Sequence, residues 1–521
     1  SSAASDVYKR QAEHELEGKV RIVATGCMGL CAQGPLVRVE IKGQKDVLYK
    51  RLEPLVARII ISEHVIPALK LEAGEAFELP EFLSKYVLSL DLPFFTKQEK
   101  VVLKQAGHLD PEDIQEYIAR GGYLALEKVL KTMTPAEVAA EIKKSGLRGR
   151  GGAGFPTGLK WELAAKVPVV DDKFIICNGD EGDPGAYMDR SILESNPHDV
   201  IEGMMIAAYA IGATEGWFYI RAEYPLAVER IEKAIKACKK NRLLGNNIMN
   251  SGFNFNIDIR LGAGAFVCGE ETALIHSIEG KRGTPRPRPP YPTEVGLWDK
   301  PSCINNVETL ANVAPIILKG ADWFSSFGTE TSKGTKVFAL TGQVEHSGLI
   351  EVPMGTTIDT IVNEIGGGVP NGKKLKAVQT GGPSGGVIPA TDVSLPVCYE
   401  ELKKVGSIMG SGGMIVMDET ADMVDIAKFY LDFTVDESCG KCAPCRIGGK
   451  QMLLLLEKIA KGRGTQKDIE ELRKIAVAMQ KASLCGLGQT APNPVLSTMR
   501  YFGEEYEAKV AANEAKNREA K

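Results

Sequence analysis

Four cysteines near the C-terminal end of the sequence have the spacing of metal-cluster ligands. Cys439, Cys442 and Cys445 lie within ESCGKCAPCRIGG, and Cys485 follows in ASLCGLGQ, giving the pattern C-x2-C-x2-C-x39-C. Three thiols so close together cannot pair among themselves as disulfides without a remainder. Zinc usually takes its ligands as two separated C-x2-C pairs, whereas a triple run plus one distant cysteine fits the corners of a 4Fe–4S cluster. The spacing favours the 4Fe–4S cluster, with zinc as the alternative.

A glycine-rich loop, LRGRGGAGFPTGLKW at residues 147–161, is the second feature with chemical potential. Dense glycines let backbone N–H groups approach a phosphate, and Lys160 can neutralise its charge. The spacing matches neither the Walker A pattern nor G-x-G-x-x-G. Taken alone, such a loop is more often a turn than a ligand site. Phe155 within it either packs in the core or stacks on a ring.

Three further loops carry polar side chains. CNGDEGDPGAYMDR follows a buried strand and crowds Asp180, Glu181 and Asp183 together, and GAGAFVCGEETALIHSIEG has two glutamates where a helix opens. A proline-rich segment, residues 281–313, ends in asparagines and a threonine suited to an amide-rich flavin ring. The acidic loop is either a solvated turn, a cation site, or a binding site for ribose hydroxyls. Each loop alone is weak support for a ligand site, but all of them in one chain call for a common explanation.

These four loops and the cysteine pattern together resemble the flavin-bearing, NADH-oxidising subunit of respiratory complex I. The acidic loop is closer to the soluble diaphorase subunits of NAD-linked hydrogenases and formate dehydrogenases. The resemblance covers about residues 100–505 and implies one FMN, NAD(H) and one 4Fe–4S cluster held by the four cysteines. The implied FMN contacts are Gly149, Gly151, Gly152, Lys160, Asn178, Asp180, Glu181, Gly269, Glu270, Asn305, Asn306 and Thr309. The implied NADH contacts are Phe155, Asp183, Glu271, Arg288 and Tyr291.

Some residues depart from the respiratory pattern of that family. Asp183 stands where the pattern has glutamate, Phe266 where it has tyrosine, and Arg288 where it has lysine. Leu163 and Tyr291 each replace a phenylalanine. The shorter carboxylate and the lost hydroxyl are expected to alter the flavin potential or the orientation of NADH.

The first two cysteines of the sequence, Cys27 and Cys31 in GCMGLCAQGP, form a C-x3-C pair. Longer members of the family that this chain resembles have a thioredoxin-like domain, with a C-x4-C pair before such a C-x3-C pair, that binds a 2Fe–2S cluster. A 2Fe–2S cluster needs four ligands, and no cysteine precedes Cys27 here. The resemblance therefore implies a truncated domain with an incomplete 2Fe–2S site.

The composition is that of an ordinary globular protein without a nucleic-acid footprint. The chain has 521 residues, a net charge of −4 and 25% charged residues, with no Lys/Arg tract. No apolar run is long enough to span a bilayer, and the first residues do not form a signal peptide. Eleven sparse cysteines argue against a disulfide scaffold and favour a reducing, cytoplasmic location.

Changes in composition divide the chain into seven segments. The expected fold is a multidomain α/β protein: a Rossmann-like FMN/NADH domain, a β-grasp (ubiquitin-like) domain, a helical bundle carrying the cluster, and the truncated thioredoxin-like N-terminus. The segments are a non-native or disordered leader (1–19), the thioredoxin-like part (20–65), a helical linker (66–135), the FMN/NADH domain (136–335), the β-grasp domain (336–418), the bundle (419–510) and a polar tail (511–521).

The expected function is NADH:acceptor oxidoreduction. NADH gives up a hydride, whereas an iron–sulfur cluster takes one electron at a time, so a flavin is needed between them. The expected partners are a thioredoxin-like 2Fe–2S subunit and a further iron–sulfur, hydrogenase or formate dehydrogenase subunit. Two alternatives stay open: a flavin-based electron-bifurcating subunit of such a complex, and a non-redox scaffold that binds zinc and nucleotide. NADH is favoured over NADPH because acidic side chains would repel a 2′-phosphate.

Overall fold

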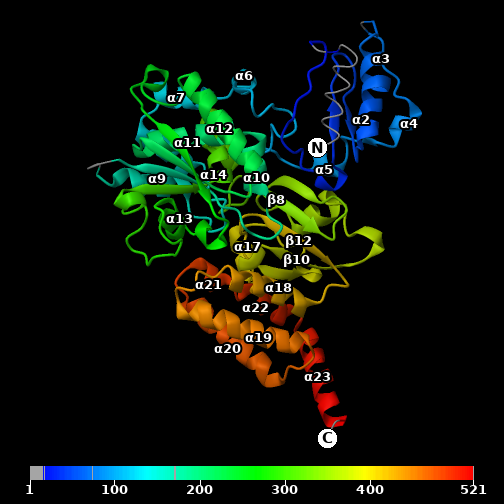
Figure 1. Cartoon of the computed structure of the whole chain (residues 1–521), viewed down its shortest axis with the longest axis vertical. Helices are drawn as coiled ribbons and strands as arrows, with labels where there is room; N and C mark the ends of the chain where they lie inside the picture. The colour runs from blue at the N-terminus through cyan, green and yellow to red at the C-terminus, as the bar shows by residue number, and fades with distance from the viewer. Residues whose placement is uncertain (1–15, 17, 73, 169–171, 520–521) are drawn as a thin grey trace.

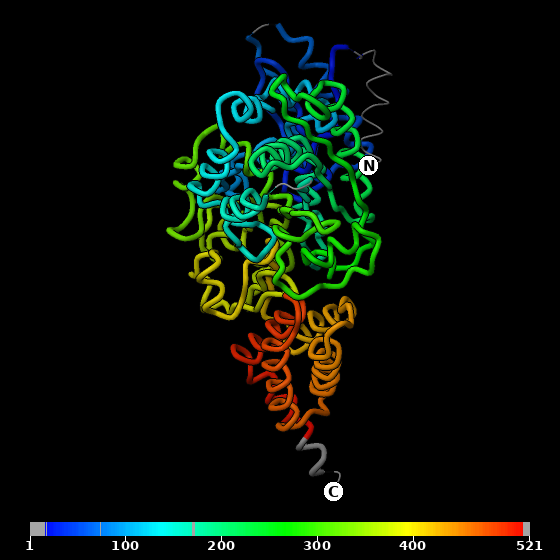
Figure 2. Tube along the Cα trace, turned by 90° about the vertical axis from the view of Figure 1, so that its left-hand side faces the viewer, coloured from blue at the N-terminus to red at the C-terminus, as the bar shows by residue number. Residues whose placement is uncertain are grey.

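The computed structural model describes Leu16 and residues 18–72, 74–168 and 172–519. The expected leader, residues 1–19, therefore lies almost wholly outside the described residues. Figure 1 shows the N-terminal part beside the larger α/β part at one end of the molecule, the second α/β part in the middle and the C-terminal helices at the other end, and Figure 2 shows the same helices at that end.

The N-terminal part is built on a small antiparallel sheet in the order β1-β2-β3. The third strand lies within the segment where the sequence predicts only helices, and it pairs Leu88 with Leu48 and Val87 with Tyr49. Two residues are too few to show the alternation by which a strand is recognised. The elements are η1 (Cys31–Gln33), β1 (Val37–Val39), β2 (Val47–Tyr49), α2 (Pro54–Ile60), η2 (Ile61–Val65), α3 (Ile66–Ala68), α4 (Glu81–Ser84) and β3 (Val87–Leu88). Three helices then lead into the next part: α5 (Pro93–Thr96), α6 (Ile114–Ala119) and α7 (Leu124–Thr132).

The largest part contains a four-stranded, wholly parallel sheet in the order β6-β5-β4-β7. Alternate residues of β4 join two different cores: Ile175 packs with α11 on one face, and Ile176 packs with α13 on the other. A parallel sheet covered by helices on both faces needs apolar residues in both directions, which explains the buried run FIIC. The strands are β4 (Phe174–Gly179), β5 (Glu215–Arg221), β6 (Asn256–Gly262) and β7 (Ser302–Asn306).

The helices of this part surround the sheet. The longest buried one, α11, begins with Pro197 at its first position and ends at Gly212 in the left-handed conformation, which are the usual start and stop signals. The helices are α8 (Pro135–Lys144), α9 (Thr157–Lys166), α10 (Met188–Ser195), α11 (Pro197–Ile211), α12 (Pro225–Lys240), η3 (Ile248–Asn250), η4 (Phe266–Gly269), α13 (Glu271–Ile278), η5 (Leu297–Asp299), α14 (Val307–Ala311), α15 (Val313–Lys319) and α16 (Ala321–Ser325).

The second α/β part has a mixed five-stranded sheet in the order β11-β10-β12-β8-β9. The strands β8 and β12, which are the first and last of this part in chain order, are parallel neighbours in the sheet. The other pairs are antiparallel. The strands are β8 (Thr335–Gly342), β9 (Gly348–Pro353), β10 (Leu375–Thr380), β11 (Gly386–Pro389) and β12 (Gly413–Asp418). The helical turns are η6 (Thr360–Ile365), η7 (Pro370–Gly372), η8 (Gly382–Ser384), η9 (Ala390–Asp392) and α17 (Tyr399–Lys404).

The C-terminal part is helical and has its own apolar core, which includes Leu431, Met452 and Leu472. Figure 1 shows α18 to α22 packed side by side beneath the mixed sheet, with α23 extending away from them. The helices are α18 (Met423–Asp436), η10 (Pro444–Gly448), α19 (Gly449–Ala460), α20 (Gln466–Ala482), α21 (Gly486–Thr490), α22 (Asn493–Tyr501) and α23 (Gly503–Glu519).

Candidate functional site

The polar loops meet at the carboxyl edge of the parallel sheet. Asn178 in β4 and Asn306 in β7 are paired in register at this edge. The Asn178 amide nitrogen donates to the Gly269 carbonyl at 2.9 Å, which brings in the loop before α13. Ligands of open α/β sheets bind at the carboxyl ends of the strands. The fold thus places three loops far apart in sequence around one binding position.

The glycine loop closes over this position with little room for side chains. A Cβ on Gly151 would lie 3.1 Å from the Asn306 Cβ. Gly152 has a φ of +120°, and a Cβ there would lie 3.2 Å from Gly410 of the neighbouring part. The Gly149 carbonyl accepts a hydrogen bond of 2.7 Å from the Tyr399 hydroxyl. Glycine is therefore required here by close approach and by backbone conformation.

The Asp180 carboxyl is buried, and neither of its oxygens has a hydrogen-bond partner among the described residues. No other carboxyl of the acidic loop is in this state in the described part of the chain. Its side chain is 9% exposed. Burial raises the pKa of Asp180 to about 7, although Arg221 opposes the rise. A buried carboxyl without partners carries a large desolvation cost unless a ligand supplies donors. Its position beside Gly269 fits the hydroxyl and N–H donors of a flavin nucleotide.

The other two acidic side chains of that loop have partners within the protein. Glu181 caps α10 by accepting from the backbone N–H groups of Asp189 at 3.2 Å and Arg190 at 3.1 Å. Burial raises its pKa to about 7. Asp183 accepts a 2.8 Å hydrogen bond from the Ser411 hydroxyl of the loop before β12, and burial raises its pKa to about 6. The mixed-sheet part therefore contributes directly to the edge of the site.

The raised pKa of Asp180 predicts a pH-dependent stability of the flavin-free protein. The folded chain keeps the Asp180 proton up to about pH 7, whereas the unfolded chain loses it near pH 4. This contribution to stability is complete below about pH 4 and is lost as the pH rises through about 7. We therefore compare the free energy of unfolding of Asp180→Asn with that of wild type. We expect the difference, in favour of the variant, to be about 2 kcal/mol larger at pH 8 than at pH 5. Thermal unfolding midpoints of both proteins at the two pH values measure this, and an unchanged difference would contradict it.

Charged residues form a chain from the glycine loop toward the solvent. Lys160 donates to the Ile304 carbonyl at 2.9 Å and pairs with Glu271 at 3.1 Å, and Glu271 also pairs with Arg288 at 2.6 Å. Burial would raise the pKa of Glu271, but the two cations outweigh it and lower the pKa.

Phe155 and Tyr291 are exposed. Two exposed rings beside an ordered ion-pair chain can receive a nucleotide.

Three residues that the sequence assigns to the flavin are engaged in the scaffold. The Asn305 side-chain oxygen accepts from the buried Trp161 indole N–H at 3.0 Å. The Thr309 hydroxyl accepts from the Arg150 backbone N–H at 2.8 Å. The Glu270 carboxylate caps α13 through backbone N–H groups of the first turn. These side chains hold the loops in place, while their backbone stays near the site.

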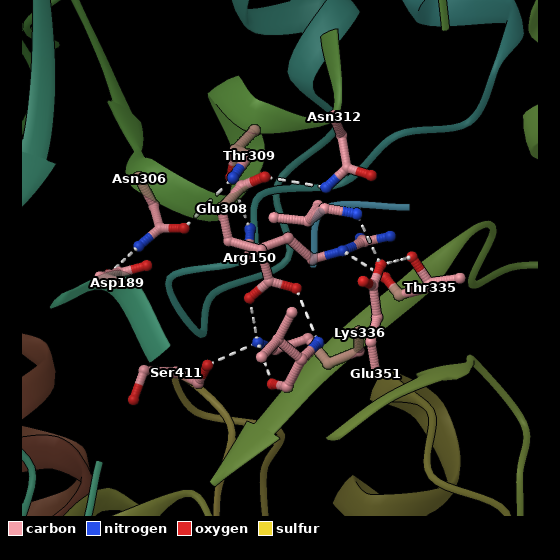
Figure 3. A network of polar contacts seen from close by, with 12 residues as sticks. Arg150, Asp189, Asn306, Glu308, Thr309, Asn312, Thr335, Lys336, Glu351 and Ser411 are labelled. Atoms are coloured by element: carbon pink, nitrogen blue, oxygen red, sulfur yellow. Dashed lines mark hydrogen bonds and ion pairs between the residues drawn. The ribbon is translucent and has the colours of Figure 1, made fainter. Parts of the chain in front are cut away.

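A network of buried polar side chains lies beneath the site (Figure 3). No motif in the sequence predicts it. Lys336 and Glu308 form a fully buried ion pair between β8 and α14, and Lys336 also donates to the Ser411 carbonyl at 2.6 Å. The Arg150 guanidinium donates to the Thr335 carbonyl at 3.0 Å. Glu351 on β9 accepts from the Thr335 hydroxyl at 2.6 Å. The network fastens the flavin loops to the mixed sheet, yet nothing in the motif TKVFAL distinguishes a buried lysine from a surface one.

The four sequence-identified cysteines converge on one cavity. Residues from four segments line it: Val267, Pro285, Ser438, Cys439, Lys441, Cys442, Cys445, Leu484, Cys485 and Leu487. Ser438 lies 3.3 Å from the Cys445 sulfur through its hydroxyl. No group of three or more His, Cys, Asp or Glu side chains in the described ranges has the geometry to hold a single ion. Four thiols spread around an apolar cavity fit a cube with an iron at each corner.

The short helix η4 (Phe266–Gly269) contributes to both the cysteine cavity and the sheet edge. Val267 lines the cavity, and a Cβ on Gly269 would lie 3.4 Å from the Asp180 carbonyl. Cys439 and Leu487 pack against the apolar core on the α13 face of the parallel sheet. Residues of η4 therefore contact both sites.

The N-terminal cysteine pair is near the acidic loop. The sulfurs of Cys27 and Cys31 are 3.9 Å apart, and the Tyr187 hydroxyl lies 3.7 Å from the Cys31 sulfur. The Gly29 carbonyl accepts from the Leu349 backbone N–H at 2.8 Å, which pins this loop to β9. The pair is thus held against both α/β parts.

Comparisons with known proteins show which family the chain is similar to. Residues 142–315 match the Nuo51 FMN-binding domain, and residues 425–509 match the NADH-ubiquinone oxidoreductase-F iron–sulfur binding region. The chain is 58% identical over 414 residues to the NADP-reducing hydrogenase subunit HndC of Solidesulfovibrio fructosivorans, covering 80% of this chain and 84% of that protein. It is 44% identical to a subunit of the NADH-quinone oxidoreductase of Aquifex aeolicus, covering 78% of this chain and 93% of that protein.

A solved structure gives the same result. The fold is similar to the crystal structure of an NAD+-reducing [NiFe]-hydrogenase in the H2-reduced state, with a TM-score of 0.71, 34% identity, and coverage of 93% of this chain and 76% of that one. None of the described helices is both long and apolar enough to cross a membrane. The predicted FMN and 4Fe–4S cluster are confirmed by the two family matches. The chain belongs to the family of NADH-oxidising FMN and 4Fe–4S subunits found in complex I and NAD(P)-linked hydrogenases.

Proposed function

We propose that this chain is the NADH-oxidising subunit of a cytoplasmic, hydrogenase-type complex, and that it passes electrons to partner iron–sulfur subunits. The observation that carries the proposal is that one short helix, η4, contacts both the orphaned Asp180 residue and the cysteine cavity. The similarity to HndC supports a hydrogenase-type complex over a membrane-bound one. A formate dehydrogenase partner and electron bifurcation have no separate support in the geometry.

The proposed cofactor contacts are those implied by the sequence, with their roles refined by the contacts. Gly151 and Gly152 admit the FMN phosphate or ring to the backbone, and Asp180 accepts from the FMN. Lys160, already paired with Glu271, contributes positive charge. Phe155, Asp183, Glu271, Arg288 and Tyr291 receive the NADH, while Glu181, Glu270, Asn305 and Thr309 hold the loops. Cys439, Cys442, Cys445 and Cys485 are the proposed cluster ligands.

The chemistry follows from this arrangement. FMN, when bound, converts the two-electron hydride of NADH into single electrons. The protein contributes stacking surfaces, charge neutralisation and a short helix that contacts both the donor and acceptor sites. No acid–base residue is required, because the transfer of hydride and electrons belongs to the cofactors. The carboxyls of the acidic loop bind and orient the nucleotides.

The domain assignments are part of the proposal. The sheet order β11-β10-β12-β8-β9, with a parallel central pair, supports a β-grasp domain at residues 336–418. The helices with their own core support a cluster-bearing bundle at 419–510. Cys27 and Cys31 are proposed as two of the four thiolates of a 2Fe–2S cluster, and the small antiparallel sheet in the same part supports a thioredoxin-like part.

The nucleotide preference tests the proposal. The 2′-phosphate of NADPH would meet the carboxylate of Asp183, and each tenfold loss of affinity corresponds to about 1.4 kcal/mol. We expect NADH to bleach the flavin absorbance with a kcat/KM about tenfold or more above that of NADPH. Anaerobic rapid mixing measures both rates, and identification of the released flavin as FMN is the control. A protein bleached by neither nucleotide would refute the proposed function, and faster bleaching by NADPH would refute the preference.

A further inference from the structure

Glu437 connects the cysteine loop to the wall of the flavin site. It lies two residues before Cys439, at the end of α18, and its carboxylate accepts the Phe266 backbone N–H at 2.9 Å. Phe266 is the first residue of η4, the helix that contacts both sites. One carboxylate thus joins two segments that are 171 residues apart in sequence.

The position of Glu437 is unfavourable for α18 itself. A carboxylate at a helix C-terminus opposes the helix dipole by about 0.3–1 kcal/mol. The last turn of α18 contains no basic residue, and Asp436 adds a second negative charge beside Glu437. Helix stability therefore does not account for the glutamate, whereas its hydrogen bond to η4 does.

The last turn of α18 holds η4 through a second contact. The rings of Phe266 and Phe433 meet edge to face with centroids 5.4 Å apart. Phe433 is four residues before Glu437 and lies on the same face of the helix. The backbone and side chain of Phe266 are both fixed by one helical turn.

The charge of Glu437 also reaches the flavin edge. Burial raises the pKa of Asp180 to about 7, and Glu223 and Glu437 add to the rise while Arg221 opposes it. A charge that acts on Asp180 acts on any group bound beside Asp180 as well.

We propose that Glu437 is a positioning residue for electron transfer between the two sites. Its hydrogen bond holds η4 against the cysteine loop and so fixes the separation of donor and acceptor, and its negative charge lowers the reduction potential of the flavin. Glu437 exchanges neither electrons nor protons in this scheme. The inference rests on the proposed function, because it needs both cofactors to be bound.

Three variants of the full chain separate the two effects. Glu437→Gln keeps an acceptor oxygen for Phe266 but removes the charge, and Glu437→Ala removes both. Asp436→Asn is the matched control, because it removes an exposed neighbouring charge at the same helix end. The measurements are the flavin midpoint potential by anaerobic spectroelectrochemistry and the rate of cluster reduction after mixing with NADH, followed by freeze-quench EPR.

We expect Glu437→Gln and Glu437→Ala to raise the flavin midpoint potential and Asp436→Asn to shift it less than either. Only Glu437→Ala should slow cluster reduction relative to flavin bleaching, by about tenfold or more, as expected when reacting groups lose their alignment. Wild-type potential and cluster-reduction rate in Glu437→Ala would overturn the inference. If that variant loses its cofactors, an unshifted potential in Glu437→Gln would overturn it. A wild-type protein whose cluster never responds to NADH would instead refute the proposed function.

Discussion

Replacing Cys485 with alanine is expected to abolish the 4Fe–4S EPR signal while NADH still bleaches the flavin. Cys485 reaches the cavity from the start of α21, opposite the three clustered cysteines. A cube held by three thiolates loses the ligand of its fourth iron. The flavin loops make no use of Cys485, so their binding should survive.

The expected magnitude is a loss of at least about tenfold in the dithionite-reduced cluster signal, with flavin bleaching within about twofold of wild type. Low-temperature EPR and anaerobic absorbance measure the two quantities on the same sample. Cys398→Ala is the matched control, because Cys398 is also buried but lies at the start of α17 outside the cavity. A full cluster signal in Cys485→Ala would show that the fourth ligand is another residue.

Replacing Lys336 with methionine is expected to cause the largest loss of stability. Lys336 is fully buried, and its ammonium group is paired with Glu308 and bonded to the Val337 carbonyl at 2.8 Å and to Ser411. Removing the cation leaves the buried Glu308 carboxylate without its counter-charge, which costs about 3–5 kcal/mol. Because α14 carries Thr309, which holds the glycine loop, the affinity for FMN should fall as well.

Differential unfolding with and without FMN measures both effects. The double variant Lys336→Met/Glu308→Gln should recover part of the loss, because its remaining partner is neutral. Lys131→Met is the matched control: Lys131 pairs with Glu127 on the surface, and such pairs contribute about 0.5 kcal/mol or less. A Lys336→Met protein as stable as the Lys131→Met protein would contradict the role of the buried network.

The convergence of the cysteines on one cavity was open to prediction from the sequence, because three of them are within seven residues of one another. Spacing of that kind restricts the geometry before any tertiary structure is known. The convergence of the loops was also predictable, since buried strands that are followed by polar residues indicate a parallel sheet with polar side chains gathered at its carboxyl edge.

The sequence did not show which polar side chains of these loops face the ligand position and which bond to other parts of the protein. Asp180 and Glu181 are adjacent acidic residues after the same strand, yet one is left without partners and the other caps α10. Likewise Asn305 accepts from Trp161 instead of facing the ligand position. Which way a polar side chain points at a strand end depends on the packing of neighbouring elements, and those are distant in sequence.

The buried pair of Lys336 and Glu308 was missed for the same reason. Residues 337–340 of β8 are all apolar and join two cores in turn, so no local pattern marks Lys336 as buried. Its ammonium group pairs with Glu308 of α14, in the other α/β part. Burial there comes from the docking of two α/β parts, which the local pattern does not encode.

A reductive titration with NADH tests the central claim most directly. The reconstituted protein is titrated anaerobically while flavin absorbance and the cluster EPR signal are recorded, and dithionite then defines complete reduction. The account predicts that about 1.5 NADH per chain reduces both centres, two electrons at the flavin and one at the cluster. A cluster that dithionite reduces but that stays unchanged through complete flavin bleaching by NADH would contradict it.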